Sequence, residues 1–313
     1  MRPVAFLFPG QGSQSPGMGK ALASAWPECA EVFRAADEAL GTPISRICFE
    51  GTEAELARTE NTQPAILAVS VAALKALGRF GIRPAAAAGH SLGEYSAHVA
   101  AGTLAFEDAV RAVRLRGRFM QEAVPEGRGA MAAILGIEPA ELERVCRESA
   151  GDEVVSPANF NGPGQVVIAG HAGAVERAGT RAIEAGARRA IKLPVSAPFH
   201  CSLMEPARER LAPVLGAIVF RDPSFPVYTN VDAAPVTTGG EARAALLRQV
   251  ASPVRWEELV RGMLDAGFDT FAEVGPGNVL AGLLRKISRD ARVLPASKPE
   301  EIEAAARELG GMA

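Results

Sequence analysis

The pentapeptide GHSLG at residues 89–93 constrains the fold of this chain more than any other stretch. A small apolar run at residues 85–88 precedes it and predicts a buried strand, while residues 94–101 behind it predict a helix. A serine between two glycines on a sharp strand-to-helix turn is the pattern of a nucleophile elbow, which holds the Ser91 hydroxyl at a helix N-terminus. The alternative is a turn that merely caps an ordinary helix, and these five residues alone do not decide between the two.

The composition is typical of a soluble globular protein, with 48% hydrophobic and 22% charged residues. A chain of 313 residues is long for one compact core, so we expect a large domain with an insertion, or two domains. The net charge of −3 argues against a nucleic-acid binder. The apolar run at residues 4–8 is short and flanked by prolines, which fits neither a signal peptide nor a membrane span.

The four cysteines are far apart in the sequence and form no C-x-x-C motif. This spacing disfavours a zinc site or a disulfide framework, so we expect no metal and a location in the reducing cytoplasm.

Short apolar runs alternate with amphipathic segments, which predicts an α/β fold with a mainly parallel sheet covered on both faces. One helix is expected to start at Thr62 with Pro64 in its first turn, and another to span residues 106–124. The expected strands of this sheet are residues 4–8, 85–88, 227–229, 270–274 and 293–295.

Residues 129–193 form a unit of their own in the pattern. Strands are expected at 130–137, 154–158, 165–169 and 190–193, helices at 139–147 and 174–185, and a turn at 159–164. The order βαββαβ is ferredoxin-like. We therefore predict a large hydrolase-like domain from residues 1–128 and 195–313, with a ferredoxin-like subdomain at 129–194.

A serine nucleophile needs a proton acceptor within hydrogen-bond reach. Elimination among the four histidines favours His200, because the other three lie beside the serine, two helical turns beyond it, or in the insertion (His90, His98 and His171). The satisfied structural histidine stays the alternative. Cys201 is a rival nucleophile in principle, but we expect it to be a buried bystander. Asp108 and Asp152 are not convincing acids, so a Ser–His dyad oriented by a backbone carbonyl is equally allowed.

Arg116 lies in apolar company on the helix at residues 106–124, since its neighbours three and four positions away are Ala112, Val113, Phe119 and Met120. A buried arginine needs an anion. Either a structural carboxylate or a ligand supplies it, and the residues alone favour the structural partner.

Taken together, these motifs resemble the malonyl-CoA:acyl carrier protein transacylases, whose fold also serves as the acyltransferase domains of polyketide and animal-type fatty acid synthases. The resemblance covers essentially the whole chain. Its markers are FPGQGSQ at 8–14, TQPA at 62–65, GHSLGE at 89–94, RG with MQ at 116–121, NFNGPGQVVI at 159–168, PFH at 198–200, Gln249 with SPV at 252–254, and EVGPG at 273–277.

The resemblance implies a ping-pong reaction in which Ser91 attacks the thioester of malonyl-CoA and His200 acts as general base. The backbone N–H groups of Gln11 and Leu92 would hold the oxyanion, and Arg116 would bind the malonyl carboxylate. A backbone carbonyl near Gln249 would orient His200. The further supporting residues would be Gln63, His90, Asn159 and Phe199, the last of which would crowd an α-methyl group.

The implied partners are malonyl-CoA and holo acyl carrier protein, with no cofactor, no nucleic acid and no membrane, and the chain is expected to be a monomer. Fatty acid synthesis is the expected pathway, and a trans-acting polyketide acyltransferase is the alternative. The rival functions are a serine thioesterase or esterase, and a docking subunit with a vestigial site. Two basic clusters could dock an acidic carrier: Arg188, Arg189 and Lys192, or Arg285, Lys286 and Arg289.

Overall fold

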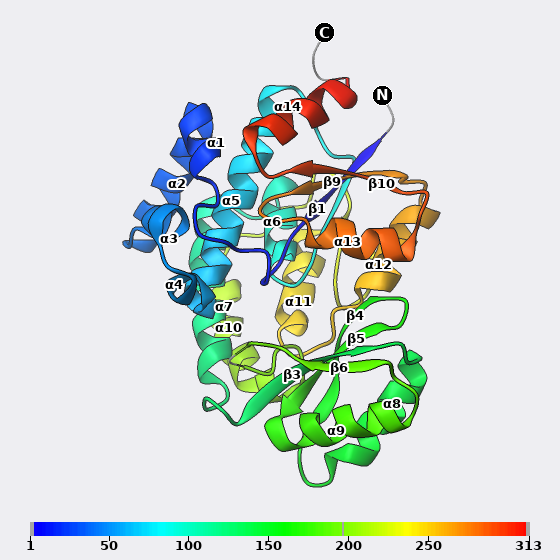
Figure 1. Ribbon diagram of the computed structural model, residues 1–313. Coiled ribbons are helices and arrows are strands. Elements are labelled where there is room, and N and C mark those ends of the chain that lie inside the picture. Colours follow the sequence, from blue (N-terminus) through cyan, green and yellow to red (C-terminus); the bar gives the residue numbers. More distant parts are fainter. Residues whose placement is uncertain (1–2, 196, 311–313) are drawn as a thin grey trace.

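The computed structural model describes residues 3–195 and 197–310, which form a large sheet with its helices and a smaller sheet below it (Figure 1). The large sheet has six strands in the order β10-β9-β1-β2-β7-β8, and every neighbouring pair is parallel except β7 and β8. The strands are β1 (Val4–Phe8), β2 (Ala86–Gly89), β7 (Val227–Tyr228), β8 (Pro235–Val236), β9 (Thr270–Val274) and β10 (Arg292–Ala296).

The side chains of β1 alternate between two hydrophobic cores, because successive residues of a strand point to opposite faces. Phe6 and Phe8 enter one core and Ala5 and Leu7 the other. The first core contains residues of α1 (Lys20–Ala25), α2 (Pro27–Leu40), α3 (Ile44–Glu50), α4 (Glu53–Ala57), α5 (Thr59–Arg79), α6 (Gly93–Ala100), α7 (Phe106–Glu122), α10 (Glu205–Gly216), α11 (Gly239–Gln249) and α14 (Pro299–Glu308). The second contains residues of α12 (Trp256–Asp265) and α13 (Val279–Ile287). The expected parallel sheet covered on both faces is thereby confirmed.

The smaller sheet has four antiparallel strands in the order β4-β5-β3-β6. Its elements are β3 (Gly129–Leu135), α8 (Pro139–Ala150), β4 (Val155–Gly162), β5 (Gln165–His171), α9 (Ala172–Glu184) and β6 (Arg189–Lys192), which gives the predicted βαββαβ order. This part has a hydrophobic cluster of its own under α8 and α9. The end of β4 also pairs with the large part, since Val254 N–H donates to Ala158 O at 2.9 Å and Phe160 N–H donates to Val254 O at 2.8 Å.

Two expectations were wrong in detail. Residues 159–162 continue β4 instead of forming a turn, because their backbone pairs with both β5 and Val254. Helix α5 begins at Thr59, so Pro64 lies inside the helix and not in its first turn. Packing against another helix holds this additional first turn in place. Gly117 of α7 lies so close to Thr59 that a Cβ added to Gly117 would be 2.5 Å from Thr59 O.

Candidate active site

The turn between β2 and α6 is a tight elbow. Ser91 has a left-handed backbone conformation with φ of 51°, which a non-glycine residue adopts only where its surroundings enforce it. The two flanking glycines leave no room for a side chain: a Cβ on Gly89 would lie 1.9 Å from the carbonyl carbon of Gly93, and a Cβ on Gly93 would lie 2.0 Å from Phe8 O. The close approach of β1, β2 and α6 therefore requires both glycines.

This crowding predicts a large loss of stability for Gly93→Ala. We expect the free energy of unfolding to fall by at least about 3 kcal/mol, because backbone must move to admit the methyl group. Gly240 is the matched control, since it lies exposed in α11, has an ordinary φ and would have no atom within 4 Å of an added Cβ. Gly240→Ala should change stability by less than about 1 kcal/mol. Urea denaturation of both variants measures the difference, and equal losses would contradict the close-approach argument.

Ser91 and His200 lie in hydrogen-bond contact, with 2.7 Å between Ser91 Oγ and His200 Nε2. His200 Nδ1 lies 2.9 Å from the backbone oxygen of Gln249, so Nδ1–H donates there and Nε2 is left as the acceptor. The imidazole is only 3% exposed. Burial and the nearby Arg116 cation lower the pKa of His200 to about 3, which keeps the ring neutral and able to accept a proton. The third member of this arrangement is a carbonyl and not a carboxylate.

Arg116 is 2% exposed, and its partners are neutral. Nη1 donates to Gln63 Oε1 at 2.7 Å, and Nη2 donates to Gln249 Oε1 at 2.9 Å and to Ser91 Oγ at 3.2 Å. Its carbon Cζ lies 5.8 Å from the ring centroid of Tyr95. Within residues 3–195 and 197–310, no carboxylate forms an ion pair with it and Nε has no partner. The sequence favoured a structural carboxylate as the partner of Arg116, but no carboxylate of the described residues is in direct contact with the guanidinium.

Two backbone N–H groups are free at the cleft, those of Gln11 and Leu92. Neither donates a hydrogen bond to any residue that the structure describes. Gln11 lies in the loop after β1, and its side-chain amide donates to Thr59 Oγ1 at 3.3 Å. Both residues line one cavity with Ser91. Free N–H groups on either side of a nucleophile can stabilise an oxyanion.

This cavity has a volume of about 120 Å³ and brings together the residues that the sequence singled out, except Gln249, which lies behind Arg116. Gln63 and Phe199 form part of its wall, and Asn159 enters it from β4. His90 also lines the cavity. Its Nε2 lies 2.8 Å from Asn161 Oδ1, so the imidazole forms its hydrogen bond with Asn161 and not with Ser91.

The remaining candidates from the sequence do not belong to the cavity. His98 is fully buried in α6, and His171 accepts a hydrogen bond at Nδ1 from the N–H of Val154 at 2.9 Å. Cys201 is buried, and its thiol donates to Pro198 O at 3.1 Å. Burial raises the pKa of Cys201 to about 11, so its thiol is protonated near neutral pH.

Sequence reasoning missed Asn230 and the role of Glu94, which hold the elbow from behind together with the predicted Gln249. Asn230 accepts a hydrogen bond from Ser91 N–H at 2.6 Å and donates to Gly89 O at 2.7 Å. The Gln249 side-chain amide donates to Ser91 O at 2.9 Å. Glu94 had been noted only as the last residue of a motif, and it accepts from both Asn230 N–H and Gln249 Nε2. The available signal for Asn230 was its place just after β7, the strand beside β2, at the carboxyl edge of the sheet.

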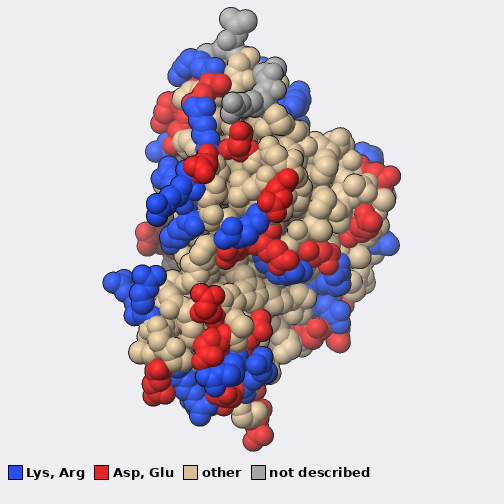
Figure 2. Space-filling model, turned by 90° about the vertical axis from the view of Figure 1, so that its right-hand side faces the viewer, with Lys and Arg blue, Asp and Glu red and all other residues tan. Residues whose placement is uncertain are grey.

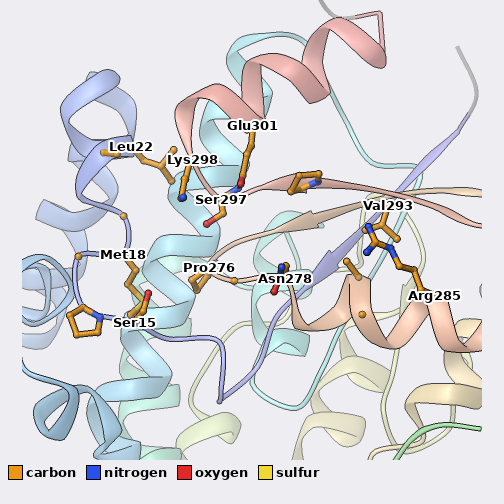
Figure 3. Close-up of a pocket in the computed structure, with 18 residues that line it drawn as sticks. Ser15, Met18, Leu22, Pro276, Asn278, Arg285, Val293, Ser297, Lys298 and Glu301 are labelled. Atoms are coloured by element: carbon orange, nitrogen blue, oxygen red, sulfur yellow. The ribbon is translucent and has the colours of Figure 1, made fainter.

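A larger cavity of about 770 Å³ lies beyond the ends of β9 and β10 (Figure 3). Figure 3 shows Met18 and Leu22 on one side, Asn278 and Arg285 of the α13 region on another, and Lys298 and Glu301 at the start of α14. No described residue lines both this cavity and the one at Ser91. We assign the chemistry to the smaller cavity, because it alone of the two contains the Ser–His contact and the unpaired arginine.

Two kinds of feature are absent from the described residues. They contain no group of three or more His, Cys, Asp or Glu side chains placed to hold a metal ion. Among them, no helix is both long and apolar enough to cross a membrane.

The fold and the site define a class, the α/β proteins that carry a serine on a strand-to-helix elbow beside a histidine. The comparisons with known proteins go further. The family described as the acyl transferase domain matches residues 5–310, so the chain belongs to that family.

Several known proteins that are similar to this chain are transacylases. The malonyl CoA-acyl carrier protein transacylase of Escherichia coli strain K12 is 49% identical over 306 residues, which cover 97% of this chain and 99% of the relative. The structure of the transacylase of that name from Coxiella burnetii has a TM-score of 0.96 and 44% identity, with 98% of each chain covered. A malonyl-transacylase in complex with a type II PKS acyl-carrier protein has a TM-score of 0.95 and 46% identity, with 98% of this chain and 99% of that chain covered.

Proposed function

We propose that this protein transfers a malonyl group from malonyl-CoA to the phosphopantetheine thiol of an acyl carrier protein, through an ester on Ser91. The observation that carries the proposal is the buried Arg116 guanidinium, which lies 3.2 Å from Ser91 Oγ without a carboxylate partner among the described residues. A malonyl group places its own carboxylate one methylene beyond the carbonyl that the serine attacks. The short distance between Ser91 Oγ and the Arg116 guanidinium matches the length of a malonyl group bound to the serine. The planar guanidinium can also donate two parallel hydrogen bonds to one carboxylate.

The geometry supports a Ser–His mechanism. As Ser91 Oγ attacks the thioester carbonyl, its proton passes to His200 Nε2, and the N–H groups of Gln11 and Leu92 face the developing oxyanion. One such donor contributes about 3–4 kcal/mol to lowering the barrier. CoA leaves with the proton from His200. The carrier thiol then gives its proton to His200 and attacks the acyl-serine. As the ester bond breaks, His200 passes this proton to Ser91 Oγ, which regenerates the free enzyme and makes the reaction ping-pong.

The supporting residues have contacts that suit these roles. Gln63 and Gln249 hold Arg116 through their side-chain oxygens, at 2.7 Å and 2.9 Å. Phe199, which is 8% exposed, narrows the cavity, and we propose that it disfavours an α-methyl group by about 1–3 kcal/mol. All steps use protein groups, so we propose that the reaction needs no metal or cofactor.

We further propose that the enzyme is a cytoplasmic monomer of fatty acid synthesis, and that residues 129–194 form a subdomain apart from residues 1–128 and 195–313. The four buried free thiols support a reducing location. The separate hydrophobic cluster of the small sheet supports the division. A carrier of polyketide synthesis is the alternative substrate, which the similarity to the transacylase complexed with a PKS carrier favours.

The carrier dock stays a prediction with two candidates. Arg188, Arg189 and Lys192 lie exposed on or beside β6, and Arg285, Lys286 and Arg289 lie exposed on or beside the end of α13. None of the six forms an ion pair with a described residue, although Lys286 donates to Gln165 Oε1 at 2.7 Å. Acidic and basic side chains are interspersed over the face shown in Figure 2, so charge alone does not single out one dock there.

The proposed function is tested by mixing the protein with malonyl-CoA and a holo carrier and weighing the intact carrier. We expect the carrier to gain one malonyl group for each CoA released. Release of CoA without a gain in carrier mass would instead show a thioesterase. Equimolar carriers from fatty acid and polyketide synthesis, offered together, should show faster loading of the fatty acid carrier, and the reverse order would favour the alternative.

A further inference from the structure

The carboxyl group of Glu94 is buried next to the site but takes no part in the steps above. Glu94 lies in the first turn of α6 and is 0% exposed. Its Oε2 accepts two hydrogen bonds of 2.8 Å, from Asn230 N–H and from Gln249 Nε2. Its Oε1 has no partner within the described part of the chain. A buried carboxyl group with one oxygen unsatisfied is costly, so its presence calls for a reason.

A single side chain, the amide of Gln249, separates Glu94 from Arg116. The amide nitrogen donates to Glu94 Oε2, while the amide oxygen accepts from Arg116 Nη2 at 2.9 Å. The same nitrogen donates to Ser91 O at 2.9 Å. Glu94 is thus a carboxyl group one hydrogen-bonded side chain away from a buried cation that lacks a carboxylate in contact. Across this short, dry path the two charges attract strongly.

We propose that Glu94 is the counter-ion of Arg116 in the free enzyme, and that it takes up a proton from solvent when a malonyl carboxylate binds Arg116. This inference rests on the proposed function, because it needs an acyl group with a carboxylate. Once the malonyl carboxylate neutralises Arg116, the buried Glu94 carboxylate behind Gln249 is no longer stabilised by a net positive charge. Its protonated form is then favoured. By linkage, ionised Glu94 weakens malonyl binding and protonated Glu94 strengthens it.

Among the titratable groups around Glu94, we expect only the Glu94 carboxyl group to change its charge near neutral pH. Burial raises the pKa of Glu94 to about 7, and the Arg116 cation opposes this shift. Asp232 has its pKa lowered by its hydrogen bonds with Arg248, so it stays ionised. The pKa values of His90, His98 and His200 are lowered by burial, and that of Tyr95 is raised.

Among the described residues, the elements packed on α6 bring no charged group other than Arg116, Arg248 and Asp232 to act on Glu94. Strands β1 and β2 carry no ionisable side chain. On α5, Lys75 and Arg79 are exposed and Glu60 faces Arg114 at 3.9 Å. Helix α11 contributes Arg248 and helix α7 contributes Arg116, and each of these cations interacts electrostatically with Glu94.

The test compares the KM for malonyl-CoA and for acetyl-CoA between pH 6 and pH 8.5. Because Glu94 ionises as the pH rises, the malonyl-CoA KM of the unchanged protein should rise by about fivefold or more, while the acetyl-CoA KM should not follow it. Glu94→Gln keeps an oxygen for the two donors but carries no charge. Its malonyl-CoA KM should stay at the low-pH value throughout. Asp232→Asn, which removes a nearby exposed carboxylate, should keep the rise.

An unchanged pH dependence in Glu94→Gln, or an equal rise for acetyl-CoA, overturns the inference and leaves the proposed function intact. Absence of malonyl transfer by the unchanged protein refutes the proposed function instead. Should Glu94→Gln fail to fold, a pH indicator in weak buffer at pH 7 decides with the unchanged protein. Loading with malonyl-CoA should take up protons and loading with acetyl-CoA should not, and equal signals contradict the inference.

Discussion

Ser91→Ala should lower the rate of malonyl transfer by about 10⁴-fold or more, because loss of the nucleophile removes the acyl-enzyme route altogether. After brief incubation with malonyl-CoA, the intact mass of the unchanged protein should increase by one malonyl group, and that of the variant should not. Ser96→Ala is the matched control. Ser96 is a nearby serine, buried in α6, and its hydroxyl has no partner among the described residues. This variant should keep its activity and acquire the malonyl mass.

Two results would contradict the role of Ser91. Malonylated peptide that maps elsewhere in the chain would place the nucleophile at another residue. Full transfer by Ser91→Ala would instead show that the transfer does not pass through this serine. The melting temperature of the variant, measured beside that of Ser96→Ala, shows whether lost activity reflects unfolding.

Arg116→Ala should lower kcat/KM for malonyl-CoA by about 30-fold to 5,000-fold, since truncating one partner of a buried charge pair costs about 2–5 kcal/mol. The loss for acetyl-CoA should be far smaller, because an acetyl group has no carboxylate to bind. Arg116→Lys should not restore malonyl transfer, as an ammonium group cannot donate to Gln63, Gln249 and the substrate in one plane. Steady-state kinetics with both acyl-CoA substrates measure the ratio.

Arg118→Ala is the control for Arg116, since Arg118 lies exposed on the same helix, α7. It should leave both substrates unaffected within about twofold, as expected of a surface substitution. Equal losses for malonyl-CoA and acetyl-CoA in Arg116→Ala would mean that the arginine supports the fold of the site and does not recognise the acyl group.

The fold could be predicted best where glycine and proline mark the ends of elements. Strand β9 has the predicted bounds of residues 270–274, because the sequence GPG follows it directly. A proline likewise separates α1 from α2, since Pro27 is the first residue of α2. The same rules failed at residues 159–162 and at Pro64, where pairing with Val254 and packing against Gly117 override the local preference of the chain.

The site residues that lie in local sequence motifs could be predicted. The serine follows from its elbow, and elimination among few histidines leads to His200. Asn230 and Glu94 could not be found this way, because they act through hydrogen bonds between residues 139 and 136 positions apart. Nor could the sequence show that Arg116 lacks a carboxylate partner, since that depends on which side chains the fold places around α7.

The burial of Cys201 has a consequence for an enzyme that handles thioesters. An acyl-serine can be attacked by any thiolate within reach, and this cysteine follows His200 directly in the chain. With its pKa raised to about 11, only about one molecule in 10⁴ carries the thiolate at pH 7. The protein thereby keeps its own sulfur out of competition, so a thiol that arrives from outside is the one that receives the acyl group.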